Sequence, residues 1–356
     1  MFTIISFILI LALLVLVHEF GHFIAAKKSG VYVEEFGFGL PPRLWGKKIG
    51  ETIYSINWLP IGGFVKVYGE EYHEQDKNFD PALKNKAFIY KKPWQKILIL
   101  TAGIIGNFLL GWLLISFLFT QGVPSPTNKV IVETIQPNSP AQEAGLKKNE
   151  EVIILIKDKE YKLSSSNDLI SLTKKFAGEP IELIVQNSNG TRKVTVTPRK
   201  NPPAGQGSLG VVITSFVEKK YPWYQAPFFG LAEAFNITWT IVSELSKTVF
   251  QLISFQKPKV DVAGPIGIAR YTGEAIKFGS NAVLELIALL SLNLAVVNIL
   301  PFPALDGGRL AFVLYEIVTK RRVNQNFERN LNLAGMIILI ALAILISIHD
   351  VIKIYR

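Results

Sequence analysis

The stretch Leu11–Lys28, "LALLVLVHEFGHFIAAKK", ends a long apolar run and carries HEFGH at positions 18–22. His18 and His22 are four residues apart, so on a helix both imidazoles project from one face and can share a metal ion. In such a motif Glu19 does not bind the metal but takes a proton from the bound water. Ionisable side chains at membrane depth cost about 2.5–3.5 kcal/mol each on insertion scales. The stretch therefore predicts a functional metal site in a membrane helix, unless the helix has left the bilayer by His18.

The composition supports a membrane protein with some soluble mass. Of 356 residues, 49% are hydrophobic, 19% are charged, and the mean hydropathy is +0.30. This balance excludes disordered and low-complexity classes. The chain has no cysteine, so disulfides and thiolate metal sites are excluded, and His, Asp or Glu must hold any metal.

Four apolar runs are long enough to cross a bilayer, and we expect transmembrane helices at 1–26, 96–119, 281–305 and 331–350. The connecting segments 27–95 and 306–330 are rich in Lys and Arg, which predicts that both are cytoplasmic. The net charge of +10 is thus explained by loops beside an anionic lipid bilayer, and no nucleic acid partner is expected.

The segment 217–280 is harder to interpret because Phe228–Phe255 is apolar yet contains Glu233, Glu244 and Lys247. We interpret it as an amphipathic linker region whose helix lies at the membrane interface. The alternative is a fifth span.

Residues 127–216 form a polar island in which short strand-like runs alternate with two helical pieces, indicating a small α+β domain. The order of its elements resembles a PDZ domain, which would be extracytoplasmic. The stretch "GSLGVVI", Gly207–Ile213, resembles the carboxylate-binding loop and its strand in circularly permuted bacterial PDZ domains. On this resemblance Leu209 and Gly210 are candidate substrate-binding residues. The alternative is a PDZ-like fold without a peptide ligand.

A catalytic zinc site needs a third protein ligand and an open position for water. His73 lies in an acidic loop and His349 at the far end of the last span, whereas Asp306 ends the third span in "NILPFPALDGGR". Two prolines break the helix there, and the glycine pair after Asp306 permits close backbone approach. Without HEFGH, a proline-terminated helix with an Asp in its exit turn would be the preferred interpretation.

HEFGH late in the first span and the pattern NxxPxPxLDGG at Asn298–Gly308 resemble the site-2 protease family of intramembrane zinc metalloproteases. "GPIGI" at Gly264–Ile268 and "GFG" at Gly37–Gly39 also resemble its bacterial branch, which inserts a PDZ domain between spans two and three. The resemblance implies Zn²⁺ held by His18, His22 and Asp306. It also implies Glu19 as the general base and acid, and Asn298 as a group that binds the substrate backbone or the developing oxyanion.

The second span departs from the family pattern, because "AGIIGN" lacks the proline that often follows the first glycine. This leaves the role of Asn107 open. Close helix packing through Gly103, Gly106 and Gly111 is the expected use of this face.

The segment Glu51–Glu70 alternates like a β-hairpin around Pro60–Gly63. In the family such a segment dips into the membrane as a β-loop, so 27–95 is expected to be a cytoplasmic or membrane-reentrant β region. An exposed strand edge at Gly62 and Gly63 could pair with an unwound substrate. The alternative is a cytoplasmic hairpin that only packs beneath the helices.

Together these observations predict a polytopic α-helical membrane protein with four transmembrane helices, a membrane-associated β-hairpin region and an inserted extracytoplasmic α+β PDZ domain. The resemblance implies a protease of the bacterial inner membrane that cuts single-span transmembrane protein substrates near the cytoplasmic side, as in anti-sigma factor cleavage or signal-peptide clearance. The alternatives are a non-enzymatic membrane PDZ scaffold and a zinc transporter. Glu19 argues against the scaffold, and convergence of the ligands at one depth argues against the transporter.

Overall fold

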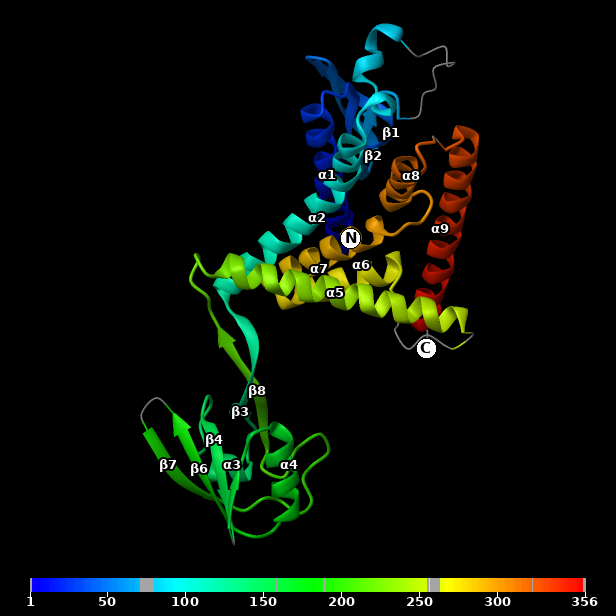
Figure 1. Cartoon of the computed structure of the whole chain (residues 1–356). Coiled ribbons are helices and arrows are strands. Elements are labelled where there is room, and N and C mark those ends of the chain that lie inside the picture. The colour runs from blue at the N-terminus through cyan, green and yellow to red at the C-terminus, as the bar shows by residue number, and fades with distance from the viewer. Residues whose placement is uncertain are drawn as a thin grey trace. The chain divides into compact units, whose positions relative to one another are not determined.

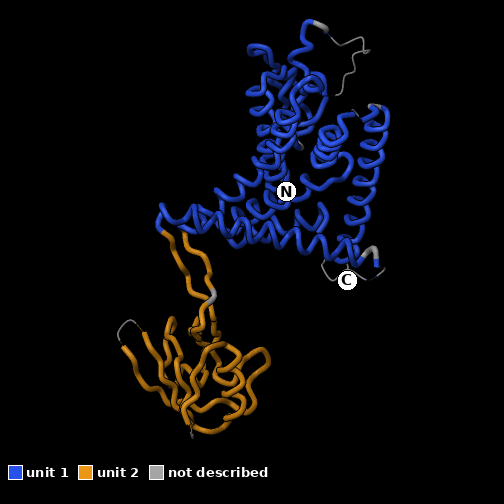
Figure 2. The backbone as a smooth tube through the Cα atoms, in the orientation of Figure 1, with its two compact units in different colours: residues 1–120, 222–356 blue, residues 121–221 orange. Residues whose placement is uncertain are grey.

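The computed structural model describes residues 2–70, 80–157, 159–187, 190–254, 256, 263–321 and 323–354. The chain forms two compact units (Figure 2). Unit 1 comprises residues 1–120 and 222–356, and unit 2 comprises residues 121–221.

Among the described residues, unit 1 contains four helices that are long and apolar enough to span a bilayer, which confirms the expected number of candidate spans. They are α1 (Phe2–Lys28), α2 (Pro93–Gln121), α7 (Ser280–Ile299) and α9 (Gln325–Ile354) (Figure 1). The shortest, α7, has 20 residues and so reaches about 30 Å, the thickness of the hydrocarbon core. In hydrocarbon, a helix is favoured because it satisfies its own backbone hydrogen bonds.

Glycines let these helices approach closely. A Cβ at Gly106 of α2 would lie 3.0 Å from the Val17 carbonyl oxygen of α1, and one at Gly111 would lie 2.7 Å from Leu292 Cδ2 of α7. The predicted packing role of these two glycines is therefore confirmed. It lets α2 approach both α1 and α7 along the apolar segments.

The β region of unit 1 differs from the predicted hairpin. Strand β1 (Val33–Ile49) pairs with β2 (Thr52–Val67) through a turn at Gly50, so a hairpin centred on Pro60–Gly63 is wrong. Phe36 of β1 pairs with two residues of β2, Tyr54 and Val65. The beginning and the end of β2 thus flank the first half of β1, and the Pro60–Gly63 segment, predicted as a hairpin turn, lies where β2 crosses over.

The remaining helical elements of unit 1 connect these parts. They are the 3₁₀ helices η1 (Pro81–Lys86) and η2 (Phe88–Tyr90) and the α-helices α5 (Ala226–Ile253), α6 (Pro265–Phe278) and α8 (Asp306–Thr319). Helix α5 is not among the four candidate spans found in the described residues, and its interfacial position stays a prediction. Segment 306–330, predicted as a loop, contains α8. Asp306 begins this new helix and does not end the third span, because α7 already stops at Ile299 before the prolines.

The "GPIGI" motif starts α6, and a buried carboxylate from another helix caps it. The backbone N–H groups of Gly264 and Gly267 donate to Asp350 Oδ2 of α9 at 3.0 and 2.8 Å. A carboxylate at a helix N-terminus satisfies free donors and complements the helix dipole. This contact ties the two segments together in unit 1.

Unit 2 is a six-stranded sheet with two helices. Five strands follow the order β7-β6-β4-β3-β8, and β5 pairs with β4. The elements are β3 (Val123–Ile135), α3 (Pro140–Glu143), β4 (Glu151–Ile156), β5 (Glu160–Lys162), α4 (Ser166–Lys175), β6 (Ile181–Asn187), β7 (Gly190–Val196) and β8 (Val211–Lys219).

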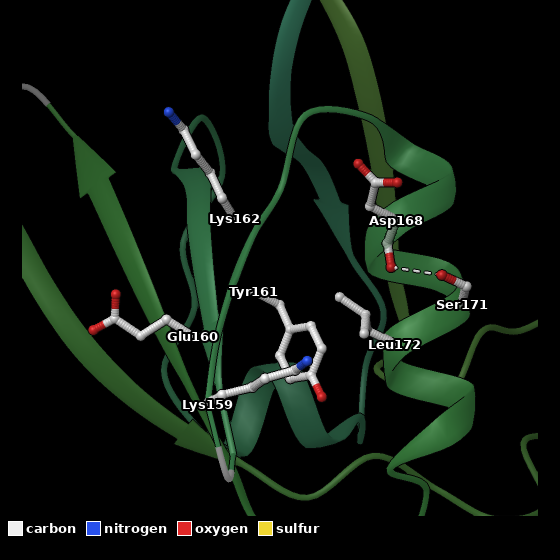
Figure 3. A pocket seen from close by; sticks show the side chains of 7 residues that line it. All are labelled: Lys159, Glu160, Tyr161, Lys162, Asp168, Ser171 and Leu172. Carbon is white, nitrogen blue, oxygen red and sulfur yellow. Dashed lines mark hydrogen bonds between the residues drawn. The ribbon is translucent and has the colours of Figure 1, made fainter.

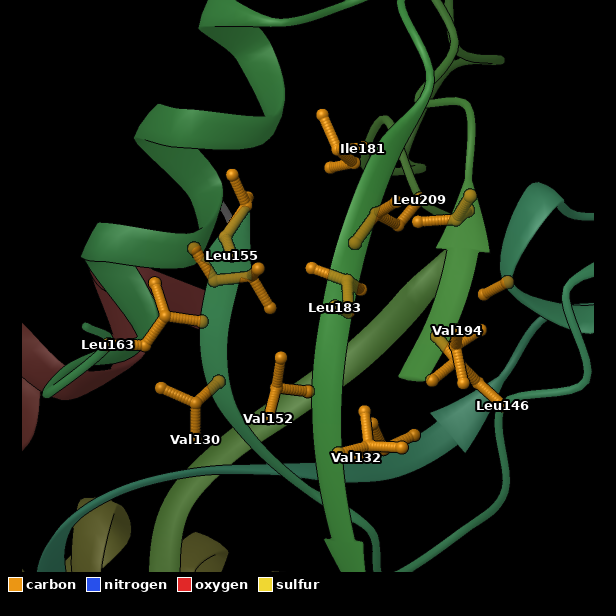
Figure 4. Packing of buried hydrophobic residues seen from close by; sticks show 14 of the residues in the cluster. Val130, Val132, Leu146, Val152, Leu155, Leu163, Ile181, Leu183, Val194 and Leu209 are labelled. Atoms are coloured by element: carbon orange, nitrogen blue, oxygen red, sulfur yellow. The ribbon is translucent and has the colours of Figure 1, made fainter. Parts of the chain in front are cut away.

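The core of unit 2 consists of aliphatic side chains that alternate along the strands, as expected for a sheet with one buried face (Figure 4). Leu155 of β4 and Leu183 of β6 are fully buried. Helix α4 begins with a capping box in which Ser165 and Asp168 satisfy each other's backbone N–H groups. Burial of the sheet face against the helices stabilises this unit.

Candidate metal centre

Three side chains from two distant segments of unit 1 converge on one point. His18 Nε2 lies 2.9 Å from Asp306 Oδ2, His22 Nε2 lies 3.2 Å from the same oxygen, and the two Nε2 atoms are 3.2 Å apart. Of the described residues, only these three form such a cluster of metal-ligating atoms. The structure thus brings together the three residues that the sequence motifs single out.

The local backbone explains why Asp306 reaches the histidines. After α7 ends, Leu300–Leu305 forms a proline-containing loop, with Ala304 at φ +75°, and Asp306 opens α8. A Cβ at Gly307 would collide with the Leu300 carbonyl oxygen, and one at Gly308 with that of Phe302. The glycine pair is therefore required for the loop to fold back over the start of α8.

Helix α9 also contacts the Leu300–Leu305 loop. The backbone N–H of Ala304 donates to Asn332 Oδ1 at 3.1 Å. A Cβ at Gly335, one turn further along α9, would collide with the Pro303 carbonyl oxygen. These contacts fix the position from which Asp306 extends.

The protonation pattern of His22 suits a metal ligand. Its Nδ1 lies 2.7 Å from the carbonyl oxygen of Ile99 in α2. A carbonyl can only accept, so Nδ1 carries the proton and Nε2 is left with a free lone pair. This Nε2 faces the cluster.

The cluster fits a zinc ion. In a tetrahedral site with ligand distances of about 2.0–2.1 Å, ligand atoms are about 3.3 Å apart. The observed edges of 2.9, 3.2 and 3.2 Å approach that value. Asp306 Oδ2 is also buried and accepts no conventional hydrogen bond within the described residues, as expected for an atom whose partner is a cation. Two imidazoles and a carboxylate are ordinary zinc ligands, and they leave a fourth position for water or substrate.

Glu19 follows His18 on α1 and is partly buried. It lies beside the β region, because a Cβ at Gly63 of β2 would be 3.8 Å from Glu19 Cγ. Gly62, at φ +80°, faces Val15 of the same helix. Of the two predicted substrate-binding glycines, Gly63 is thus next to the glutamate of the HEFGH motif, and Gly62 lies one helical turn before it, at Val15.

Asn298, in the last turn of α7, lies beside the cluster. Its Nδ2 lies 3.4 Å from His18 Nε2. An amide at this distance from the ligand atoms can donate a hydrogen bond to a group bound beside them.

Two other predictions concern histidines outside the cluster. His349 lies near the end of α9 and contributes no atom to it. His73 lies outside the described residues.

One residue was missed: Asn107 of α2 is fully buried, with Nδ2 3.3 Å from His18 Nδ1. The available signal was a polar side chain within an apolar span.

In unit 2, the loop that resembles a carboxylate-binding loop precedes the edge strand β8. The Leu209 side chain is buried in the core, so only its backbone is available, and the Gly210 N–H donates to the Gly207 carbonyl oxygen at 3.0 Å. Within the described residues, no strand pairs with the second edge of β8. This edge approaches α4, since Ser166 Oγ and Ser215 Oγ are 2.8 Å apart.

A separate hollow of about 450 Å³ lies between β5 and α4. Figure 3 shows Tyr161 and Leu172 turned toward each other there. Its remaining lining residues are polar or charged, namely Lys159, Glu160, Lys162, Asp168 and Ser171. The hollow therefore does not coincide with Leu209 and Gly210.

Comparison with known proteins agrees with this site. The model of Peptidase family M50 matches residues 6–342. "Putative zinc metalloprotease CPE1693" of Clostridium perfringens (strain 13 / Type A) is 35% identical over 343 residues, covering 95% of each chain. "Putative zinc metalloprotease CA_C1796" of Clostridium acetobutylicum is 33% identical over 352 residues, covering 99% of this chain and 98% of that protein.

A further relative, "Regulator of sigma-W protease RasP" of Bacillus subtilis (strain 168), is 26% identical over 427 residues, and 99% of both chains is covered. The family match thus spans the helices that carry His18, His22 and Asp306. The chain belongs to peptidase family M50, the site-2 proteases, and is a zinc metalloprotease.

Proposed function

We propose that this chain hydrolyses a peptide bond in or near the transmembrane segment of single-span membrane proteins. The observation that carries the proposal is the convergence of His18, His22 and Asp306 beside Glu19, with both histidines and the glutamate on an apolar helix long enough to span a bilayer. A soluble protease has no need to bury such a cluster among four apolar helices.

In the proposed mechanism His18, His22 and Asp306 would hold the zinc, which when bound would supply Lewis acidity toward the scissile carbonyl and the attacking water. Glu19 accepts the proton of the attacking water and then donates it to the leaving amine nitrogen. Asn298 donates its amide N–H to the oxyanion that develops on the carbonyl oxygen.

A helical substrate shields its own amides, so it must unwind before attack. We propose that the unwound segment pairs with β2 at Gly62–Val67. Within the described residues, this stretch pairs with β1 on one edge only. Its glycine end adjoins Glu19, so a paired substrate would be held next to the proton acceptor.

The substrate class follows from the family and from the name of one relative. The Bacillus subtilis protein is named a regulator of sigma-W protease. We propose anti-sigma factors or signal-peptide remnants as substrates of this chain, in regulated intramembrane proteolysis at the cytoplasmic side of the membrane.

For residues 127–216 we propose an extracytoplasmic PDZ domain that regulates access. The free edge of β8 beside α4 supports peptide binding by strand addition, with the backbone at Leu209 and Gly210 recognising a carboxylate. Replacing 130–215 by a flexible linker should preserve cleavage of trimmed substrates and admit some untrimmed ones. Loss of cleavage of a trimmed substrate by an inserted, zinc-loaded deletion variant would contradict this role.

The test of the proposed function is Glu19→Gln in purified protein reconstituted with a single-span model substrate. The amide cannot accept the proton, so cleavage should fall by about 10²–10⁴-fold, the usual contribution of a general base. Zinc content should not change, because the ligands remain. The matched control is Glu285→Gln, the same substitution in α7 about three and a half turns before Asn298; it should leave cleavage unchanged.

The same variant identifies substrates. Glu19→Gln expressed in membranes should retain uncut single-span proteins, which can be captured and identified. Normal turnover by Glu19→Gln would contradict the assigned proton transfer, and cleavage restricted to soluble unfolded proteins would contradict the intramembrane substrate class.

A further inference from the structure

The strongest feature not used by the proposed mechanism is the contact between Asn107 and His18. Asn107 lies in α2 and has no exposed surface. One end of its amide is 3.3 Å from His18 Nδ1, on the side of the imidazole away from the metal cluster. The other end, Oδ1, is buried without a hydrogen-bond partner in the described part of the chain.

The proton on His18 decides which end of the amide suits this contact. His18 Nε2 lies within 3.2 Å of the other two candidate ligand atoms, so it must present a lone pair to bind zinc. The proton of the neutral ring must then be on Nδ1. An N–H at Nδ1 needs an acceptor, and the amide nitrogen is not one. A rotation of the amide by 180° places Oδ1 at Nδ1 and provides that acceptor.

His22 provides an internal comparison. Its Nδ1 donates to the Ile99 carbonyl oxygen, which also belongs to α2. Ile99 and Asn107 are eight residues apart, about two turns of one helix. In zinc proteins, a hydrogen bond from the second ring nitrogen commonly fixes the orientation and tautomer of a histidine ligand.

We infer that Asn107 is a positioning residue whose side-chain oxygen accepts a hydrogen bond from His18 Nδ1–H and thereby turns the His18 Nε2 lone pair toward zinc. This inference rests on the zinc site of the proposed function. It assigns α2 a definite task, because this one helix then orients both histidines of α1.

The position of Asn107 is itself held by α7. Ser291 Oγ, which is also fully buried, donates to the Asn107 backbone carbonyl oxygen at 2.8 Å. The main chain is therefore anchored independently of the amide, so replacing the amide need not displace α2. This separation makes the inference testable by substitution of the side chain alone.

The experiment measures zinc affinity of the purified full chain by competition with a chelator, in Asn107→Asp and Asn107→Leu. Both replacements have the same number of side-chain heavy atoms as Asn, branched at the same carbon, although the methyl groups of Leu are bulkier. Asp keeps an oxygen acceptor for His18 Nδ1–H, whereas Leu removes it. We expect Asn107→Leu to bind zinc about 10–100-fold more weakly, the usual effect of losing such a partner, and Asn107→Asp to remain within a few-fold of the original protein.

If Asn107 served only for packing, Asn107→Leu should bind zinc more tightly than Asn107→Asp, because Leu suits an apolar interior and a buried carboxylate does not. Equal zinc affinity in all three proteins, or loss in Asn107→Asp alone, would overturn the inference. Asn107→Ser and Asn107→Ala provide a second pair of variants without a buried charge. The Asn107→Ser protein should bind zinc more tightly than the Asn107→Ala protein, because Ser keeps an oxygen that can accept a hydrogen bond. Equal affinities in that pair would likewise count against it.

Ser116→Ala is the control, because it removes a buried hydroxyl from the same helix, where Ser116 Oγ donates to the Trp112 carbonyl oxygen, without changing the partner of His18 or the anchor of Asn107, and should leave zinc affinity within a few-fold. Absence of zinc from the original protein would refute the proposed function and this inference together. Normal zinc binding and cleavage in Asn107→Leu would refute only the inference.

Discussion

Gly103→Ala is the substitution for which the structure predicts the most specific damage. Gly103 of α2 faces the candidate ligands directly. A Cβ there would lie 2.8 Å from His18 Cε1 and from His22 Cδ2, and closer still to His22 Nε2, one of the ligand atoms. Any side chain at position 103 would enter the space of the two imidazoles, so at least one ring would have to move.

The required movement follows from these distances. Ordinary van der Waals contact begins at 3.4 Å, so both rings must retreat by at least 3.4 − 2.8 = 0.6 Å. Metal–ligand distances tolerate about ±0.2 Å. We therefore expect zinc affinity to fall by about 10–100-fold, comparable to loss of a supporting contact. Cleavage should fall further, because a misplacement of about 1 Å at a reacting centre can lower the rate about 10²-fold.

The assay compares zinc content after dialysis, zinc affinity and cleavage in Gly103→Ala and Gly106→Ala. Gly106 is the control because it lies on the same helix and the three atoms nearest its Cβ all belong to Val17 of α1, the closest being the carbonyl oxygen at 3.0 Å, and none belongs to a candidate ligand. Alanine favours a helix by about 1 kcal/mol over glycine, so neither variant should lose helix stability for that reason. Unchanged zinc affinity in Gly103→Ala, or an equal loss in Gly106→Ala, would refute the reasoning.

Three further predictions concern other parts of the chain. Asp306→Ala removes one of three protein ligands, so zinc content should fall measurably; full occupancy would require a different ligand. Arg192→Ala leaves the buried Glu150 carboxylate without its guanidinium partner and should lower hydrogen-exchange protection in β6 and β7 by about 3 kcal/mol. Burial would raise the pKa of Glu150, but hydrogen bonds from Arg192 and the Lys147 N–H outweigh burial and lower it. The contribution of ionised Glu150 to the folding stability of unit 2 is thus complete above the unfolded pKa of about 4.3, and it is lost as the pH falls through the lower pKa of the folded state. This loss of stability on acidification should be smaller in Arg192→Ala. If α5 is interfacial, Lys219→Cys and Lys277→Cys in this cysteine-free chain should both react with an impermeant maleimide from outside the cell; opposite sidedness would contradict the zinc-site topology.

The local pattern of the sequence was sufficient for several features. Long uninterrupted apolar runs permit only helices in a bilayer, so the four candidate spans are readable from composition. The spacing of His18 and His22 places both rings on one helical face whatever surrounds them. These properties depend on neighbours within one or two turns, which the sequence states directly.

Pairing between distant segments was not readable in the same way. "PIGG" at Pro60–Gly63 has the composition of a turn, yet the turn lies at Gly50, and β2 crosses over because both of its halves find partners on β1. Likewise, two prolines indicated where α7 stops, but the sequence did not show that a new helix starts at Asp306, after a loop that α9 contacts.

Asn107 illustrates the same limit at the site. In the sequence it is one amide in an apolar run without a spacing relation to HEFGH, and packing was the simplest interpretation. The glycines around it let α2 approach α1 until the amide contacts His18, 89 positions earlier. The sequence alone predicted which residues carry the chemistry, and its motifs single out the three side chains that converge. The tertiary structure decided which side chains orient them, because that depends on the distance between helices and not on any period within one.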